Sequence, residues 1–314
     1  MGASGNLNTK NNLLESETMQ RDDLFGNLIC PDCRGKILAS SDKQLSCADC
    51  GRIFPIGKVI DMLPSAMKRN YEDDAWKILP YEGAAKPAWM ALLHKKDRVL
   101  YFYEEILPKF DFAGKVLEVG AGTSWASALI KKKYPQNLVV ATDISPYALE
   151  RGVEVVKLLD SSVDFHIACN AERMPFADGY FDVVISNATI HHFPDPQQGV
   201  REIWRVLKRG GRSCALGEVA AGALFKSILT SRVGPAGKRA RSFEVEEKVY
   251  SLNTWTRFFS ASGFKDIKVS FDKTWQHKLY DWFTVLYYRF ASTVPNIFLG
   301  NFLPCNVDIY ATKP

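Results

Sequence analysis

Residues 116–130, "VLEVGAGTSWASALI", join an apolar run, a glycine-rich turn and a run with helically spaced apolar residues. This order predicts a buried strand, a tight turn at Gly120 and Gly122, and a helix over 123–134. A strand that leads into a helix through such a turn is the unit from which parallel sheets are built. Because cofactors bind over such turns, the first question is which cofactor this turn suits.

Strands and helices alternate along the rest of the chain. Ser145 and Pro146 predict the start of a second helix, as N-cap and first helical residue. Gly210–Gly211 and Gly263 predict the ends of two later helices. The strands are expected at 115–120, 137–144, 163–170, 181–187, 212–219, 264–271 and 307–314. The pattern predicts an α/β fold, a doubly wound, mostly parallel seven-stranded sheet with helices on both faces.

A dinucleotide site requires the pattern G-x-G-x-x-G, in which the third glycine lets helix and strand pack closely. Here Trp125 takes the third position, where it is expected to hold the helix off the strand and crowd a pyrophosphate. Glu118 precedes the turn, and its carboxylate would repel phosphates. Asp143 ends the second strand and could bind a ribose diol in either cofactor class. The turn therefore argues against a dinucleotide.

Four segments in order resemble the motifs of class I S-adenosylmethionine-dependent methyltransferases of the type 11 kind. They are "VLEVGAGTS", "ATDIS", "NAERMPFADGYFDVVISNATIHHFPD" and "EIWRVLKRGGR". Each segment alone is a weak signal, whereas the ordered set is specific. The resemblance covers about 112–271 and the last strand, and implies a Rossmann-like fold, methyl transfer, and S-adenosyl-L-methionine as cofactor.

The resemblance also implies roles for single residues. Asp143 would hold the ribose hydroxyls. Asn170 stands where the family usually has Asp, and its side-chain oxygen can still accept a bond from the adenine amino group or simply cap a turn. Asn187 would lie beneath the transferring methyl group. The complete implied cofactor set is Glu118, Gly120, Ala121, Gly122, Asp143, Ile144, Asn170, Ala171 and Asn187.

His191 and His192 follow the fourth strand of the methyltransferase region. Either is a candidate general base, which methyl transfer needs only if the acceptor keeps its proton until attack. Either can equally be a structural residue. Glu218, after the fifth strand, is a candidate substrate ligand or a solvated strand end.

Cys30, Cys33, Cys47 and Cys50 form two CxxC pairs. Four thiolates in two such turns can build the closed tetrahedral site of a structural zinc ion. The segment "CADCGRIFPIGKVIDMLP" resembles the zinc ribbon of a small protein that partners several RNA and protein methyltransferases, and the same ribbon occurs fused to bacterial methyltransferases. A redox role for the pairs is the weaker alternative.

The domain prediction is a disordered tail over 1–22, a zinc ribbon over 23–64, a helical lid or linker over 65–111, and a methyltransferase domain over 112–314 with an aromatic-rich insertion at 273–304. Net charge is +5, which permits an anionic partner without demanding one. No signal peptide and no apolar run of about 18 residues is visible, so a cytoplasmic protein is expected, with peripheral membrane contact through 273–304 as an option.

Three functions remain open from the sequence. The preferred one is methylation of a small-molecule, glycan or lipid-linked acceptor. The first alternative is an rRNA or tRNA base methyltransferase, because a ribbon ahead of this fold resembles rRNA guanine methyltransferases. The second is an inactive module that binds a partner through the ribbon. The insertion at 273–304 could pack internally, contact lipid or form a dimer, and the basic segment 237–242 could hold an anion or be a solvated loop.

Overall fold

The computed structural model describes residues 18–67, 76–77, 83, 86–222, 248–272, 274, 286, 289, 301 and 304–314. The basic segment 237–242, most of the insertion 273–304 and the first 17 residues of the predicted tail lie outside this set. Residues 18–26 are helical, and this helix buries Leu24 and Phe25. The end of the predicted tail is therefore part of the folded structure.

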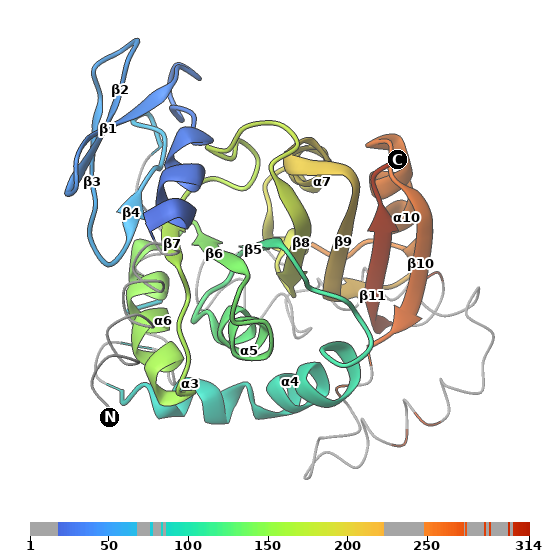
Figure 1. Cartoon of the computed structure of the whole chain (residues 1–314). Helices are drawn as coiled ribbons and strands as arrows, with labels where there is room; N and C mark the ends of the chain where they lie inside the picture. The colour runs from blue at the N-terminus through green and yellow to red at the C-terminus, as the bar shows by residue number, and fades with distance from the viewer. Residues whose placement is uncertain are drawn as a thin grey trace, which may run out of the picture.

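The main sheet has eight strands among the described residues, in the order β10-β11-β9-β8-β5-β6-β7-β4 (Figure 1). Strands β4 to β9 pair in parallel, while β11 is antiparallel to both β9 and β10. The strands are β4 Ile60–Asp61, β5 Lys115–Val119, β6 Leu138–Asp143, β7 Phe165–Ala168, β8 Phe181–Asn187, β9 Leu207–Ala220, β10 Lys265–Phe271 and β11 Cys305–Thr312. The predicted doubly wound, mostly parallel sheet is confirmed, with one strand more than the seven expected.

Eight helical segments with complete bounds lie in the described part of the chain. They are α3 Trp89–His94, α4 Lys96–Tyr101, the π-helix η1 Phe102–Ile106, α5 Trp125–Lys133, α6 Pro146–Leu158, the 3-10 helix η2 Ile190–His192, α7 Pro196–Val206 and α10 Leu252–Ala261, besides residues 18–26. The Ser145 hydroxyl accepts the Ala148 N–H at 3.1 Å, so the predicted N-cap of α6 is confirmed. Gly263 has φ +98° just past α10, as a C-terminal glycine requires.

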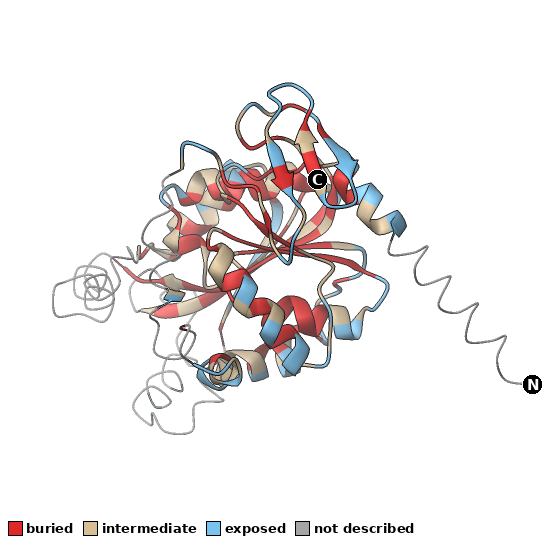
Figure 2. Cartoon of the chain, turned by 90° about the vertical axis from the view of Figure 1, so that its left-hand side faces the viewer, coloured by how far each residue is buried: buried red, intermediate tan, exposed pale blue. Residues whose placement is uncertain are grey.

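Two apolar layers cover the two faces of the sheet. One layer contains residues from the 18–26 helix, α7 and α10, among them Leu24, Val200 and Trp255. The other contains Phe102 from η1 and Trp125 from α5. Figure 2 shows the buried strands between these helical layers. No helix of the described residues is long and apolar enough to cross a membrane.

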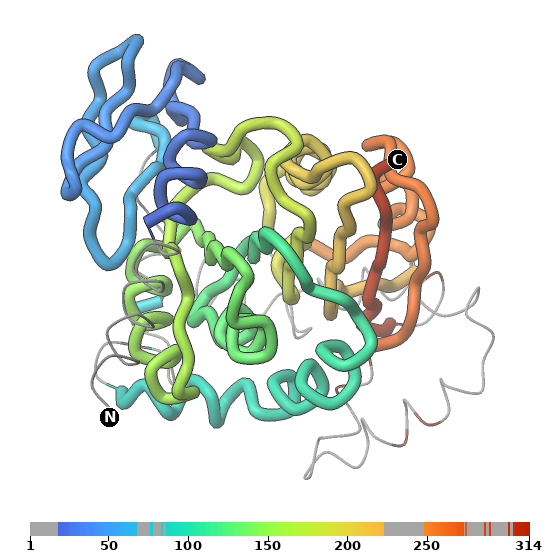
Figure 3. The backbone as a smooth tube through the Cα atoms, in the orientation of Figure 1, coloured from blue at the N-terminus to red at the C-terminus, as the bar shows by residue number. Residues whose placement is uncertain are grey.

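Residues 37–55 form a separate antiparallel sheet, in which β2 Gln44–Cys47 pairs with both β1 Ile37–Ser41 and β3 Ile53–Pro55. The chain then enters the main sheet as β4, whose Ile60 and Asp61 pair with Ile167 and Ala168 of β7 (Figure 3). The eighth strand therefore comes from the segment predicted as ribbon. The ribbon and the large domain share one sheet and one apolar core, which also includes Phe54.

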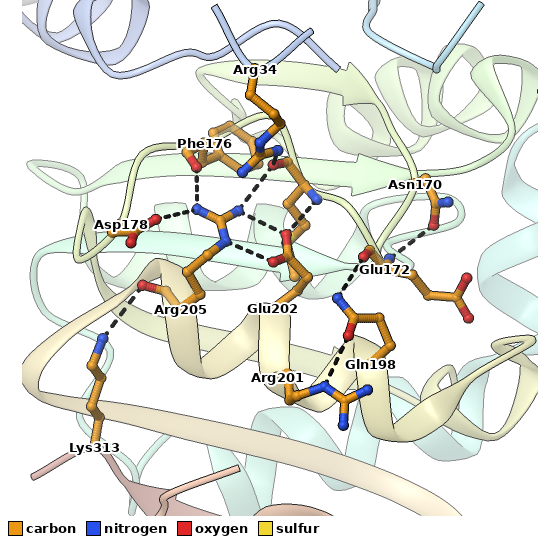
Figure 4. A network of polar contacts seen from close by, with 11 residues as sticks. Arg34, Asn170, Glu172, Phe176, Asp178, Gln198, Arg201, Glu202, Arg205 and Lys313 are labelled. Atoms are coloured by element: carbon orange, nitrogen blue, oxygen red, sulfur yellow. Dashed lines mark hydrogen bonds and ion pairs between the residues drawn. The ribbon is translucent and has the colours of Figure 1, made fainter. Parts of the chain in front are cut away.

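A polar network fixes this junction on the loop that follows β7 (Figure 4). The Met174 carbonyl accepts Nη1 of Arg34 at 2.8 Å and Nη2 of Arg205 at 3.0 Å. The Glu202 carboxylate accepts the Met174 N–H at 2.8 Å and Nε of Arg205 at 2.7 Å. Arg173 reaches in the other direction and donates to the Pro31 carbonyl at 3.0 Å. The loop is thus held from both the ribbon and α7.

One local expectation is wrong. Gly210–Gly211 does not end α7, because the helix stops at Val206 and β9 begins at Leu207. Trp125 is buried in the apolar layer that also contains strand residues of the sheet, and its indole packs edge-on against the Phe102 ring with centroids 5.6 Å apart. A close approach of α6 to the glycine turn occurs at Gly152, where a Cβ would lie 2.7 Å from the Ser124 hydroxyl oxygen.

Candidate active site

The carboxyl ends of the parallel strands meet at one edge of the sheet, and the strand order reverses at β5. Strand β5 runs into the glycine turn, β6 ends at Asp143, and β8 ends at Asn187. Glu218 lies near the end of β9. In open α/β sheets, ligands bind outside the carboxyl ends at such a switch point. The predicted site residues of β5, β6 and β8 therefore lie on the edge where a ligand is expected.

The glycine turn leaves no room for side chains at two positions. Gly120 has φ +65°, and a Cβ there would lie 2.1 Å from Cγ2 of Thr189. Gly122 has φ +51°, and a Cβ there would lie 3.0 Å from the Trp76 indole. Both positions combine the left-handed conformation with a close neighbour, which explains the glycines. Trp76 comes from the segment predicted as lid.

Glu118 is buried beneath the turn and faces α5. Its Oε2 accepts the Ser127 backbone N–H at 2.9 Å and the Ser127 hydroxyl at 2.5 Å. Burial raises the pKa of Glu118 to about 7, and the negative charge of nearby Asp143 adds to the shift. The carboxyl thus anchors the first turn of the helix that follows the glycines.

The Asp143 carboxylate accepts backbone hydrogen bonds from the glycine turn and from the start of α6. Its Oδ2 accepts the Gly122 N–H at 2.8 Å, and its Oδ1 accepts the Ser145 N–H at 3.0 Å. The Asp143 carbonyl accepts the Cys169 N–H at 2.9 Å, which brings the segment after β7 alongside. Ile144 follows and is half-buried.

Asn170 and Ala171 begin the loop after β7, and both are half-buried. The Asn170 side-chain oxygen accepts the Glu172 N–H at 2.8 Å, so this side chain caps a turn. The loop leads on to Met174, the residue held jointly by Arg34 and Arg205. The ribbon is therefore bonded to the loop that carries these two predicted site residues.

Asn187 is the last residue of β8, and an arginine side chain from α4 donates a hydrogen bond to it. Nη1 of Arg98, on α4, lies 3.2 Å from Asn187 Oδ1 and 3.1 Å from Oδ2 of Asp272. Thr189 closes the same corner, because its hydroxyl donates to the Gly120 carbonyl at 3.1 Å. The end of β8 is thus linked both to the glycine turn and to α4.

A second buried carboxyl lies behind Arg98. Tyr101 donates to Oδ2 of Asp308 at 2.5 Å, and Gly217 N–H donates to Oδ1 at 2.9 Å. Burial, together with the negative charge of Asp272, raises the pKa of Asp308 to about 7. Asp272, directly after β10, and Asp308, in β11, are therefore both close to Arg98.

His191 and Glu218 form a buried pair. The His191 Nδ1 lies 2.7 Å from Glu218 Oε2. Glu218 also accepts the backbone N–H groups of Thr189, Ile190 and His191 at 3.1–3.2 Å. Because the carboxylate can only accept, the Nδ1 of His191 carries the proton of the neutral ring and Nε2 is the nitrogen that can accept. The His192 ring lies beside it, with centroids 4.2 Å apart.

The predicted site residues at the carboxyl ends of β5, β6 and β8 lie close together at one edge of the sheet. His191 lies near them because it belongs to the loop that follows β8. The sequence reasoning missed Arg98, Asp272, Asp308 and Thr189. A carboxylate inside the otherwise apolar strand pattern "NVDIYA" was the available signal for Asp308, because a buried charge requires a partner. Arg98 lies in the segment 65–111, which was expected only as a helical lid or linker.

The four cysteines lie together in the ribbon, away from this edge. Their sulfur atoms are all within 4.8 Å of one another. Gly35 N–H donates to the Cys33 sulfur at 3.4 Å and Cys50 N–H to the Cys47 sulfur at 3.5 Å. Such N–H···S bonds stabilise thiolates, and four clustered sulfurs fit the tetrahedral preference of zinc.

Comparison with known proteins supports the resemblance to methyltransferases. Residues 117–215 match the family model described as "Methyltransferase domain". The chain is 38% identical over 155 residues to 2-methyl-6-phytyl-1,4-hydroquinone methyltransferase 1, chloroplastic, of Oryza sativa subsp. japonica. This match covers 49% of the chain and 42% of that protein, so the chain spans less than half the length of this relative.

Solved structures show the same fold. A chain of the complex between the Haloferax volcanii Trm112 methyltransferase activator and the putative methyltransferase is similar, with a TM-score of 0.53 and 16% identity, over 79% of this chain and 100% of that chain. Haemonchus contortus phosphoethanolamine N-methyltransferase 2, in complex with S-adenosyl-L-methionine, has a TM-score of 0.51 and 14% identity, over 80% of this chain and 61% of that chain. The Rossmann-like methyltransferase fold is confirmed.

Proposed function

We propose that this chain is an S-adenosylmethionine-dependent methyltransferase that acts on a small-molecule acceptor. The observation that carries the proposal is the glycine turn at the switch point, bonded through Gly122 N–H to the Asp143 carboxylate. The family match spans this turn, Asp143 and Asn187. A turn with one small side chain, next to a carboxylate at the carboxyl edge, fits a cofactor with a ribose and a zwitterionic tail.

The residues of the edge fit this cofactor. The turn Gly120–Ala121–Gly122, whose one side chain is the Ala121 methyl group, would pack against its methionine part. Both Asp143 oxygens accept a backbone N–H, and a carboxylate is the kind of acceptor that ribose hydroxyls require. Ile144, Asn170 and Ala171 would surround the adenine, and Asn187 would face the methyl group. Bound there, the cofactor supplies a methyl group on a sulfonium, which is already a good leaving group.

His191 is the proposed general base, and Glu218 orients it. The Nδ1–H bond to Glu218 fixes the tautomer, so Nε2 can take a proton from the acceptor as the new bond to the methyl carbon forms. The same carboxylate holds three successive N–H groups of the β8 loop, so base and loop are positioned together. His192 is the second candidate for this role.

The acceptor that we favour is an aromatic compound with hydroxyl groups. Three of the relatives matched over about half of this chain are named as methyltransferases of a hydroquinone. A base that accepts a proton at the methyl-transfer edge suits a phenolic hydroxyl. A lipid-linked form of such a compound would agree with peripheral membrane contact through 273–304, one of the three options left open for that segment.

The four cysteines are proposed to hold one structural zinc ion. Four protein ligands leave no open position for water or substrate, so the metal would act on folding and not on the reaction. Since β4 belongs to the main sheet, the ribbon would stabilise the edge of the methyltransferase domain.

The test is transfer of a labelled methyl group from S-adenosylmethionine, with three acceptor pools in parallel: hydroxylated aromatics with and without prenyl chains, glycan precursors, and total RNA. We expect label only in the aromatic pool, and a His191→Gln variant that loses it. Label in RNA would support the rRNA or tRNA alternative. Cofactor binding without transfer to any pool would favour the partner-binding alternative.

A further inference from the structure

Arg98 crosses from α4 to the carboxyl edge of the sheet and meets Asn187 there. Its side chain is 19% exposed, and it pairs with Asp272, whose side chain is 1% exposed. Gly217 makes the approach possible, because a Cβ on Gly217 would lie 1.9 Å from Nη1 of Arg98. The chain thus places a largely buried guanidinium beside the residue proposed to face the methyl group.

The guanidinium determines which way the Asn187 amide faces. Arginine carries only donors, so the amide atom 3.2 Å from Nη1 is the oxygen. The Asn187 amino group must then point elsewhere. Both hydrogens of Nη1 are used, one for Asn187 and one for Asp272. The remaining donors are the Asn187 amino group and the Nε–H and Nη2–H groups of Arg98.

These remaining donors are open to a ligand. In the described part of the chain these N–H groups make no hydrogen bond. None of their nitrogen atoms is one of the buried side-chain atoms that lack a hydrogen-bond partner, so they are accessible. The cluster therefore presents several N–H groups from two side chains at the end of β8. The side-chain oxygens of the cluster are already engaged. Asn187 Oδ1 and Asp272 Oδ2 accept from Nη1 of Arg98, and Asp272 Oδ1 accepts the Thr274 N–H at 2.6 Å. The cluster therefore offers a ligand donors and no acceptor.

We propose that Arg98 and Asn187 bind the methyl acceptor of this enzyme through their N–H groups. They select a substrate by one oxygen atom, that of a phenolic or hydroquinone hydroxyl in its neutral or singly ionised form. This assignment rests on the proposed function and names its substrate class more closely. A site that offers only N–H donors favours a substrate oxygen that accepts hydrogen bonds well. It discriminates against the methyl ether of the same compound, because the ether oxygen accepts more weakly and carries added bulk.

The charge of the cluster argues against a phosphate at this place. The positive charge of Arg98 is balanced by the buried Asp272 at 3.1 Å. A dianion would face an ion pair with no net charge and a second carboxyl, Asp308, behind it. A phenol or phenolate oxygen, with at most one negative charge, is stabilised well by hydrogen bonds alone. The remaining N–H groups of Arg98 and Asn187 can supply these bonds.

The experiment titrates the protein, saturated with S-adenosylhomocysteine, with methylhydroquinone kept reduced and with its dimethyl ether. We expect the wild type to prefer the hydroquinone at least about tenfold, as hydrogen bonds to a charged donor allow. Arg98→Met/Asp272→Asn removes both partners of the ion pair together, so neither of the two is left as an unpaired charge, and should abolish the preference. Arg98→Lys should retain only part of it.

Tyr101→Phe is the matched control, because it alters the same cluster on the side that faces Asp308 and should keep the preference. Equal affinity for both probes in the wild type, no affinity for either, or a preference that survives in Arg98→Met/Asp272→Asn would overturn the proposal. Displacement of methylhydroquinone by inorganic phosphate would also overturn it. S-adenosylhomocysteine affinity is measured in every variant, so a failure of the proposed function is seen separately as lost cofactor binding.

Discussion

The Nδ1 of His191 lies 2.7 Å from Oε2 of Glu218, and both side chains are buried at the carboxyl edge of the sheet. Glu218 at the same time binds three consecutive backbone N–H groups of the β8 loop. The imidazole is therefore held in one tautomer by the residue that also shapes its loop. This relationship links the β9 end to the proposed proton acceptor.

The first prediction concerns this pair. Glu218→Gln and His191→Gln should each lower kcat about 10²-fold, because a positioned base contributes at least that much. The double variant should be no worse than the stronger single one, since the residues act as a unit. Affinity for S-adenosylhomocysteine should change little. Additive losses, or a larger loss in the His192→Gln control, would contradict the assignment.

The second prediction concerns Glu118 and pH. Burial raises the pKa of this carboxyl to about 7 from an ordinary 4.5. The folded state therefore binds the proton more tightly, and the free energy of unfolding rises as pH falls from 7 to 4.5. The rise is about 3 kcal/mol for this group. Below 4.5 the gain is complete, and above 7 it is lost.

Denaturant unfolding of the wild type and Glu118→Gln at pH 5, 6, 7 and 8 measures this contribution. The glutamine keeps an oxygen for Ser127 and carries no proton equilibrium, so its stability should depend less on pH by that amount. Asp308, whose pKa is also raised, stays in both proteins and cancels in the comparison. Parallel pH curves for the two proteins would exclude the raised pKa.

The third prediction concerns the ribbon junction. Arg205→Met should lower the free energy of unfolding by about 3–5 kcal/mol, because it leaves Glu202, with a side chain 10% exposed, without its cation. Arg201→Met, on the same helix with a side chain 50% exposed, is the matched control and should cost under about 0.5 kcal/mol. Equal effects of the two substitutions in chemical denaturation would refute the importance of the network.

The fourth prediction concerns the metal. The purified chain should contain one zinc ion, and Cys47→Ser or a chelator should remove it. Because Arg34 and Ile29 of the ribbon bond Met174 and Pro175, zinc loss should loosen the loop and weaken S-adenosylhomocysteine binding about tenfold. Metal analysis and calorimetry are the measurements. Unchanged affinity and melting temperature in the metal-free protein would show that the ribbon is energetically separate.

The sequence was sufficient where the determining residues are neighbours in the chain. Ser145 and Pro146 start α6, and Gly120 and Gly122 make the turn, through local backbone requirements. Each strand ends close to its predicted position because apolar runs and turn residues mark it. The order of strands and helices, with the ordered motifs, then predicts the fold class.

It was insufficient where distant segments meet. The two-residue strand β4 has no pattern of its own and exists because β7 offers a free edge. Arg98 lies far along the chain from both Asn187 and Asp272, so only the folded structure shows that they meet.

The most direct test of the central claim is calorimetric titration of the chain with S-adenosylhomocysteine, for the wild type, Asp143→Asn and Asp160→Asn. Asp160 lies after α6 with its side chain fully exposed, so its variant controls for charge alone. The proposed function predicts one site per chain, at least about tenfold weaker binding in Asp143→Asn and no change in Asp160→Asn. A folded wild type that binds neither S-adenosylhomocysteine nor S-adenosylmethionine would contradict it.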